Sequence, residues 1–275
     1  MTTPSLFIGV VSHPASRFVA NQDPAGLGAT LSTWVPGSRL EVCVRNFFDE
    51  SGKELDERSV QAALTAELAG ELRWARHLER RLELRWWAMY AARWIKRLSK
   101  RLKSPGSGVV RRLLNIERSH LHLLQMGLES GAPWVLILED DAMSDDVQDL
   151  AVGLIALMDS GKTDAFINLS DSFSPRALGI AHLLDAAQGV SWLGRVPRAI
   201  LESRLPATNT VCAIAYSRSM AALLLDYFDS MPEKPVLPID WKLNEALMSL
   251  ARKSHESELT CMFVEPAPIV QMSMK

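Results

Sequence analysis

Apolar and polar positions along the chain follow two periods, which predict strands interleaved with helices. Short apolar runs bounded by turn residues are typical of buried strands, whereas apolar residues three and four positions apart indicate helices. Strands are predicted at residues 6–11, 39–48, 134–138, 164–170, 210–217 and 259–266. Helices are predicted at residues 54–103, 109–128, 147–158, 218–228 and 241–253. This alternation predicts a layered α/β fold.

One segment, 54–105, departs from the rest of the chain in both pattern and charge. It has few helix breakers, and the sequence SPGSG at 104–108 ends it. Residues 73–103 hold eleven lysines and arginines against two glutamates, a net charge of +9, so the rest of the chain carries −11. We therefore predict a single domain, 1–275, with a helical, basic, Trp-rich insertion at 54–105.

The basic segment 73–103 has three interpretations. Its apolar stripe follows helical spacing at Trp87, Ala91, Trp94, Leu98 and Leu102. The stripe can pack on the domain while the charges are solvated, or it can lie on an anionic membrane surface with its Trp side chains as anchors. Binding to a polyanion such as RNA is the third interpretation. We expect no nucleic-acid partner, because the chain is close to neutral and contains no recognisable RNA-binding module.

Composition indicates an ordinary globular protein of 275 residues, with 48% hydrophobic residues, 23% charged residues and a net charge of −2. The three cysteines are far apart and form no CxxC pair, so a zinc or redox motif is not expected. No apolar run approaches the ~20 residues of a membrane span, and the run at 6–11 is too short for a signal peptide. The expected location is cytoplasmic, with possible peripheral contact with the inner face of a membrane.

The sequence WVLILEDDAMSDD places three consecutive acids, Glu139, Asp140 and Asp141, directly after an apolar strand. Asp145 and Asp146 fit the N-cap and first turn of the following helix. The carboxyl end of a strand is where open α/β sheets bind ligands, and carboxylate oxygens are preferred ligands of Mg²⁺ and Mn²⁺. The residues alone leave two interpretations, a solvated strand end or a cation site.

The segment VLILEDDA resembles the signature of glycosyltransferase family 25, the lipopolysaccharide-type glycosyltransferases. Other segments resemble further elements of that family in the same order, and the resemblance covers roughly residues 111–273. These segments are Ser119-His120 ahead of the acidic strand, TDAFINLS, AIAYSRSMAALLL, PVLPIDW and the closing EPAPIVQMS. The N-terminal third departs from the family pattern, with Arg17 as its candidate for the Arg-rich loop.

The resemblance implies a GT-A-like, Rossmann-type mixed sheet flanked by helices. It also implies a metal-dependent glycosyltransferase that uses Mn²⁺ or Mg²⁺. The enzyme would move a hexose of the galactose type from a UDP-sugar to a cell-envelope glycan or glycolipid, with inversion. A catalytically inactive relative that serves as a membrane- or partner-binding scaffold is the alternative. A homo-oligomer is also compatible with the sequence.

The resemblance assigns a role to several residues. Asp141 and Glu139 are the expected metal ligands, and Asp240 is the expected catalytic base. The expected donor-binding residues are Glu139, Asp140, Arg17, Ser119 and His120. Two of these residues have structural alternatives. His120 shares a helix face with apolar residues and can be a buried structural histidine, and Asp240 can be the N-cap of the helix that follows it.

Overall fold

The computed structural model of the chain describes residues 5–12, 42–48, 107–172, 181–203, 208, 210–230, 239–253 and 259–272. The structural statements that follow concern these residues. The predicted insertion at 54–105 and the predicted donor contact Arg17 lie outside the described residues.

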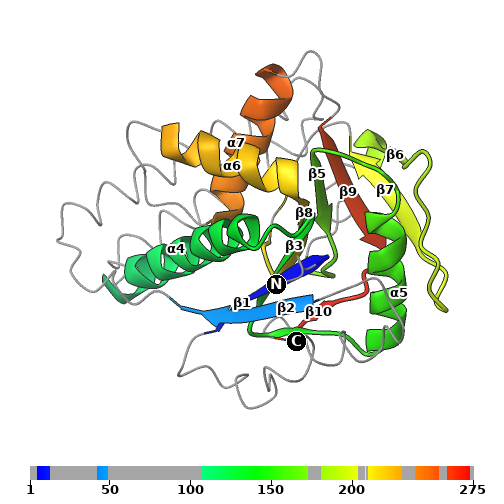
Figure 1. Ribbon diagram of the computed structural model, residues 1–275, viewed down its shortest axis with the longest axis horizontal. Coiled ribbons are helices and arrows are strands. Elements are labelled where there is room, and N and C mark those ends of the chain that lie inside the picture. The colour runs from blue at the N-terminus through cyan, green and yellow to red at the C-terminus, as the bar shows by residue number, and fades with distance from the viewer. Residues whose placement is uncertain are drawn as a thin grey trace, which may run out of the picture.

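Eight strands form one mixed sheet in the order β2-β1-β3-β8-β5-β9-β7-β6 (Figure 1). The strands are β1 (Leu6–Val11), β2 (Val42–Phe47), β3 (Trp134–Glu139), β5 (Ala165–Asn168), β6 (Leu184–Ala186), β7 (Ala199–Ser203), β8 (Ala213–Ser217) and β9 (Thr260–Glu265). Strand β1 pairs in parallel with β2 and β3, and β5 pairs in parallel with β9. Strand β8 runs antiparallel to both β3 and β5, so β8 points opposite to the two strands on either side of it, which share one direction.

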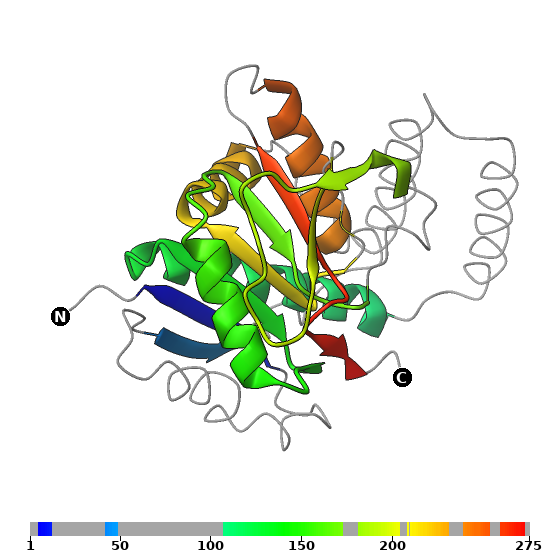
Figure 2. The same cartoon turned by 90° about the vertical axis from the view of Figure 1, so that its right-hand side faces the viewer.

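Helices cover both faces of the sheet, which gives three layers (Figure 2). The α-helices are α4 (Ser107–Glu129), α5 (Val147–Met158), α6 (Arg218–Ser230) and α7 (Ile239–Lys253). A short 3-10 helix, η3 (Ala181–Leu183), precedes β6. Buried residues of α5 pack on one face of the sheet, and those of α4, α6 and α7 pack on the other. This arrangement buries apolar side chains on both faces of the central strands, as their continuous apolar sequences require.

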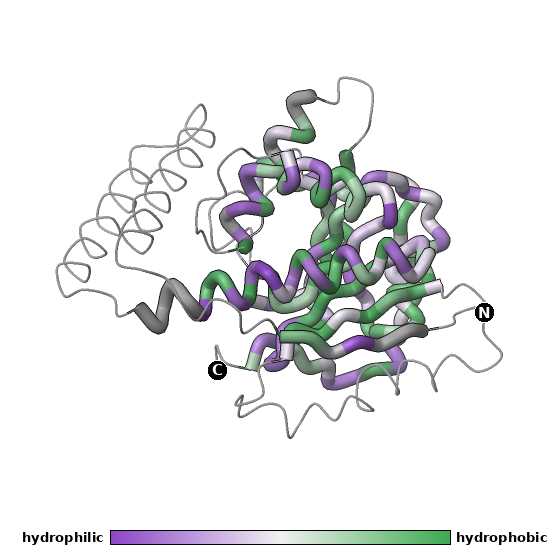
Figure 3. Tube along the Cα trace, turned by 60° about the vertical axis from the view of Figure 1, so that its left-hand side comes forward, coloured by the Kyte–Doolittle hydropathy of each residue, from purple (hydrophilic) through white to green (hydrophobic). Residues whose placement is uncertain are grey.

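The central strands are coloured mostly as hydrophobic along their lengths (Figure 3), and their buried side chains belong to two apolar clusters, one on each face of the sheet. Along β3, Trp134, Leu136 and Leu138 face the α5 layer, whereas Val135 and Ile137 face the layer of α4, α6 and α7. The side-chain period of two therefore places the next residue, Glu139, on the same face as α4 and α7.

A two-stranded antiparallel sheet lies beside the end of β3. It pairs β4 (Ala142–Met143) with β10 (Val270–Gln271), and Gln271 is opposite Ala142. The segment that closes the described chain therefore lies beside the acidic turn that follows β3.

Asp149, on α5, fixes the loop that precedes β7. Its carboxylate accepts hydrogen bonds from Trp192 Nε1 at 3.2 Å, from the Val196 amide at 2.9 Å and from Arg198 Nε at 3.1 Å. Burial alone would raise the pKa of Asp149, but these hydrogen bonds and the Arg198 charge outweigh burial and lower the pKa. The ionised carboxylate thus holds the loop on the α5 face.

The predicted α/β architecture is confirmed as a mixed sheet flanked by helices. The predicted bounds of β1 and α5 agree with the structure, and the other predicted elements within the described residues differ by a few residues at their ends. Strands β6 and β7 and the β4–β10 pair were not predicted. In the described part of the chain, no helix combines the length and apolar character needed to cross a bilayer.

Candidate functional site

The candidate site lies where the carboxyl end of β3 meets the beginning of β8. The β3–β8 ladder ends with Leu138 opposite Ala213, and the Glu139 amide then donates to the Cys212 carbonyl at 2.8 Å. Because the two strands are antiparallel, residues 73 positions apart in sequence, Glu139 and Cys212, lie side by side at this edge of the sheet.

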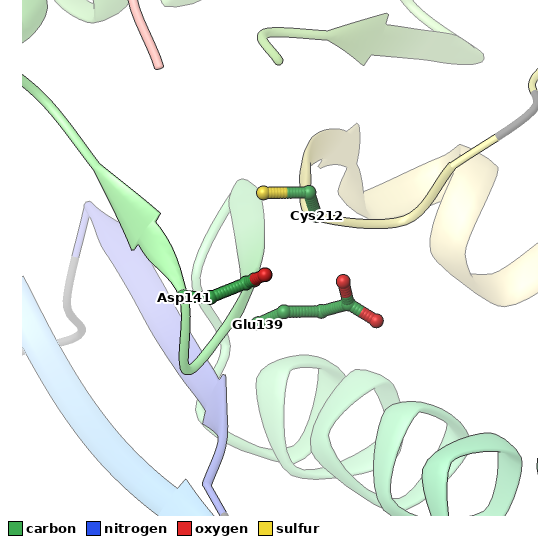
Figure 4. Close-up of side chains that lie close together, drawn as sticks. All are labelled: Glu139, Asp141 and Cys212. Carbon is green, nitrogen blue, oxygen red and sulfur yellow. The ribbon is translucent and has the colours of Figure 1, made fainter. Parts of the chain in front are cut away.

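Three possible metal-ligand side chains converge at this edge (Figure 4). Glu139 ends β3, Asp141 lies in the turn that follows, and Cys212 lies directly before β8. One ligand atom from each residue lies within 4.8 Å of the other two. Asp141 is 5% exposed and Cys212 is fully buried, whereas Glu139 is partly exposed. Two carboxylates that share one buried edge fit a hard divalent cation, which would offset their mutual repulsion.

Hydrogen bonds from the C-terminal segment fix the acidic turn. The Met272 amide donates to the Asp141 carbonyl at 3.0 Å. Gln271 Nε2 donates to Glu139 Oε2 at 3.1 Å, and the Gln271 amide donates to Asp171 Oδ1 at 2.9 Å. Gln271 therefore orients one oxygen of Glu139 and also connects the turn to the end of the β5 segment.

Four carboxylates are electrostatically coupled at this edge. The pKa of Glu139 rises from 4.5 to about 8, first because of burial and then because of the negative charges of Asp141, Asp240 and Asp140. The positive charge of Arg112, on α4, acts in the opposite direction. Glu139 therefore binds a proton at neutral pH when nothing else neutralises the site, and a cation would compete with that proton.

Asp240 reaches this site from a helix on one face of the sheet. It is the second residue of α7, so it lies in the first turn of the helix; the alternative interpretation as an N-cap is wrong. The same turn is anchored to α4 by a buried ion pair between Lys242 and Glu117, whose side chains are 3% and 7% exposed. This pair fixes the start of α7 against α4, and with it the position of Asp240.

Cys212 is the neighbour of the acids that sequence reasoning missed. Burial raises the pKa of its thiol, the charges of Glu139, Asp141 and Asp171 raise it further, and a hydrogen bond with Ser170 opposes them. The thiol is therefore protonated at neutral pH unless a cation replaces the proton. The three cysteines are too far apart to form a motif, and only the antiparallel β3–β8 pairing brings Cys212 to the acids.

Hydroxyl groups form a chain beside the thiol. Ser170 Oγ and Ser172 Oγ are 2.6 Å apart, and Ser172 Oγ donates to Thr210 Oγ1 at 2.9 Å. Thr210 Oγ1 in turn accepts from the Cys212 amide at 3.2 Å. Ser172 is partly exposed, so this chain connects the buried thiol with the protein surface.

A second set of polar side chains connects this edge with α7. Asn244, one helical turn beyond Asp240, binds both the amide and the carbonyl of Thr208. Asn168 Nδ2 donates to Thr208 Oγ1 at 3.3 Å. These contacts fix the segment before β8 against α7. They therefore also fix the position of the hydroxyl chain relative to Asp240.

Ser119 and His120 lie in the core between α4 and the sheet. Ser119 is fully buried and its hydroxyl donates to the Asn115 carbonyl at 2.6 Å. His120 is also fully buried, and its Nε2 lies 2.8 Å from the Tyr216 hydroxyl. Burial lowers the pKa of His120 to about 3, so its ring is neutral. Of its two interpretations, His120 thus fits the buried structural histidine.

The remaining predicted residues fall into two groups. Glu139, Asp140, Asp141 and Asp240 are brought together at one edge of the sheet. Asp146 is the N-cap of α5, where its Oδ1 accepts from the Asp149 amide at 2.9 Å, as predicted. Beyond Cys212, the structure adds two residues to the site, Arg112 and Gln271. Gln271 lies in the EPAPIVQMS segment that carries part of the resemblance, whereas no sequence signal singled out Arg112.

No protein-family model matches this chain, and no curated protein matches it closely enough to indicate a relationship.

Proposed function

We propose that this protein is a metal-dependent glycosyltransferase with a GT-A-like fold of the family 25 type. It transfers a hexose of the galactose type from a UDP-sugar to a glycan or glycolipid acceptor of the cell envelope. The observation that carries the proposal is that Asp240, on α7, lies near enough to Glu139 at the end of β3 for its negative charge to raise the pKa of Glu139, together with those of Asp141 and Asp140. Asp240 is about 100 positions from the three acids in sequence, and the resemblance to family 25 implies a role for each of the four residues.

The chemistry of the ligand side chains supports Mn²⁺ or Mg²⁺ as the cofactor. Glu139 and Asp141 supply oxygen ligands, and the hydrogen bond from Gln271 Nε2 orients the carboxylate of Glu139. When bound, such a cation neutralises the diphosphate of the donor and the charge that develops on the leaving nucleotide. Arg112 supplies a positive charge on the α4 side of Glu139, which favours a diphosphate there.

Asp240 is the candidate base. An inverting transfer requires a carboxylate that takes the proton of the acceptor hydroxyl on the face of the sugar opposite the leaving group. Asp240 is partly exposed and is carried by a different element from the proposed metal ligands. The buried pair of Lys242 with Glu117 positions the first turn of α7, so Asp240 has a fixed approach to the site.

The polar edge of the sheet supplies candidate contacts for the sugar. Asp140 is partly exposed, and so is Ser172, whose hydroxyl lies between those of Ser170 and Thr210 in the hydroxyl chain. Sugar hydroxyls are recognised by such combinations of carboxylates and hydroxyls, which both accept and donate hydrogen bonds. We also propose that the protein is cytoplasmic and contacts the inner face of an anionic membrane through residues 73–103. Those residues lie outside the described part of the chain.

The test is hydrolysis of UDP-galactose and UDP-glucose with Mn²⁺ by the wild type and by Asp141→Asn. The proposal predicts Mn²⁺-dependent release of UDP from at least one donor, and a loss of about 100-fold or more in the variant. Asp145→Asn is the matched control, because Asp145 is an exposed acid beyond the cluster and should retain full activity. Equal activity of wild type and Asp141→Asn would contradict the proposal.

A further inference from the structure

The thiol of Cys212 changes which cations the acidic site should prefer. Carboxylate oxygens suit hard cations such as Mg²⁺ and Mn²⁺, whereas thiolates select soft or borderline cations such as Zn²⁺. In this site the Cys212 sulfur and the oxygens of Glu139 and Asp141 all lie within 4.8 Å of one another (Figure 4). A single ion can therefore contact one soft and two hard ligands from three places in the chain.

The three ligand residues are held in place by contacts that do not depend on a cation. The hydrogen bond from the Glu139 amide to the Cys212 carbonyl couples the two residues through the backbone. Thr210 Oγ1 accepts from the Cys212 amide, and the Met272 amide binds the Asp141 carbonyl. Backbone contacts of this kind reduce the cost of assembling the ligands, so the thiol is available to an ion that can replace its proton.

We propose that Zn²⁺ and Cd²⁺ bind this site through Glu139, Asp141 and Cys212, displace Mn²⁺ and inhibit the enzyme. The inference builds on the cation site of the proposed function. On binding, the S–H bond of Cys212 breaks, its proton passes to solvent and a sulfur–metal bond forms, with no change of oxidation state. Because metal binding and proton loss are both reversible, the Cys212 thiol makes the activity responsive to thiophilic metal ions.

Coordination geometry explains the inhibition. A six-coordinate Mn²⁺ or Mg²⁺ held by two carboxylates retains about four positions for phosphate oxygens and water. A tetrahedral Zn²⁺ held by three protein ligands retains about one position. It cannot accept two oxygens of a diphosphate without losing a protein ligand. The soft ion therefore binds the protein more tightly and the donor less well.

The experiment is a Cd²⁺ titration of the full-length protein, followed by the sulfur-to-cadmium charge-transfer absorbance in the ultraviolet. We expect a saturable band with one Cd²⁺ per chain in the wild type. Cys212→Ser should lose the band and weaken Cd²⁺ binding by at least about tenfold, the order seen when a metal site loses a supporting group. Its affinity for Mn²⁺, measured by electron paramagnetic resonance, should change less than about threefold, because the oxygen ligands remain.

Cys261 supplies a matched control. It is fully buried on β9 in the opposite apolar layer from Cys212, and its thiol pKa is also raised by burial. Cys261→Ser should keep the band, and so should a double variant, Cys43→Ser with Cys261→Ser, whose remaining cysteine is Cys212. Retention of the band in Cys212→Ser, or its loss in the double variant, would overturn the inference.

Two further readouts separate this inference from the proposed function. Glu139→Gln keeps the thiol and should weaken Cd²⁺ binding while leaving a residual band, so the result does not depend on the folding of Cys212→Ser alone. Added Cd²⁺ should also release bound Mn²⁺ from the wild type, and independent binding of the two ions would overturn the inference. Neither readout uses a sugar donor, so failure of UDP-sugar turnover with an intact Cd²⁺ band would reject the transferase and not the thiol site.

Discussion

Asp240 in the first turn of α7 lies close enough to Glu139 at the end of β3 for its negative charge to raise the pKa of Glu139. The two residues are 101 positions apart, and α7 is held at this place by the buried pair of Lys242 with Glu117. A carboxylate carried by a separate element thus faces the acidic turn. In the proposed reaction, the catalytic base is therefore on α7, whereas the metal ligands are on β3 and the turn that follows it.

Asp240→Asn tests that division of roles. The amide cannot accept the proton of the acceptor hydroxyl, so we expect kcat to fall by about 10²–10⁴-fold. Mn²⁺ binding should change less than about tenfold, because Asp240 affects the metal ligands only through its charge. Steady-state transfer assays and Mn²⁺ titration by electron paramagnetic resonance measure the two effects. A parallel loss of Mn²⁺ binding and turnover would instead make Asp240 part of the metal site.

The raised pKa of Glu139 predicts a pH-dependent affinity for Mn²⁺. Below about pH 8 the cation must displace a proton from Glu139, so the Kd should fall as pH rises from 6 to 8, by up to about tenfold per unit. Isothermal titration calorimetry at several pH values measures this slope. Glu139→Gln cannot release a proton and should bind more weakly with a flatter profile, whereas an equal slope in both proteins would contradict the assignment.

The same shift predicts how stability depends on pH without metal. Folded Glu139 retains a proton up to about pH 8, whereas in the unfolded chain it loses the proton near 4.5. This contribution to the free energy of unfolding is therefore complete below about pH 4.5 and lost as pH rises to about 8. Denaturant unfolding at pH 5, 6, 7 and 8 measures the decline. Glu139→Gln should reduce the decline of the free energy of unfolding with pH. An equal decline in the wild type and the variant would contradict the raised pKa of Glu139.

The buried pair of Lys242 with Glu117 should be costly to break from one side. Lys242→Met leaves Glu117 buried beside an apolar side chain, and we expect a loss of about 3–5 kcal/mol in the free energy of unfolding. Adding Glu117→Leu should recover at least half of that loss. The partly exposed pair of Lys162 with Glu202, at 3.8 Å, is the control, and Lys162→Met should cost less than about 1 kcal/mol. Equal effects of the two lysine variants in urea unfolding would contradict this reading.

Gly153 on α5 should tolerate no larger residue. A Cβ at this position would overlap the ring of Trp192, which is held in place by its hydrogen bond to Asp149. Gly153→Ala should therefore lower the free energy of unfolding by about 1–3 kcal/mol, despite the better helix propensity of alanine. Val152→Ala, at an exposed position on the same helix, should have little effect. Thermal unfolding of both variants makes the comparison, and an unchanged Gly153→Ala would contradict the packing of Trp192.

The central elements were predictable because their patterns of apolar and polar residues match their burial directly. The run at β1 and the helical pattern of α5 have clear ends, Pro4 before β1 and the cap Asp146 before α5. The strands missed, β6 and β7, lie at the edge of the sheet, where exposed positions interrupt the apolar pattern. The β4–β10 pair has only two residues in each strand, which is too short for any periodic signal.

The acids of the site could be named from the sequence, but their partners could not. Glu139, Asp140 and Asp141 can be recognised in the sequence as three charges at the end of an apolar strand. Cys212 has no comparable sequence signal, because its position beside the acids depends on the antiparallel pairing of β3 with β8. Arg112 is one of many charged residues on a helix, and only the packing of α4 places it near Glu139. Long-range pairing of this kind is invisible to local periodicity.

The central claim is a cation-dependent site for a nucleotide sugar, and the most direct measurement is thermal shift with a panel of nucleotide sugars, with and without Mn²⁺. The account predicts that at least one UDP-sugar raises the Tm of the wild type only when Mn²⁺ is present, and that Asp141→Asn abolishes this shift. No shift with any nucleotide sugar in the presence of Mn²⁺, or an equal shift in Asp141→Asn, would contradict it.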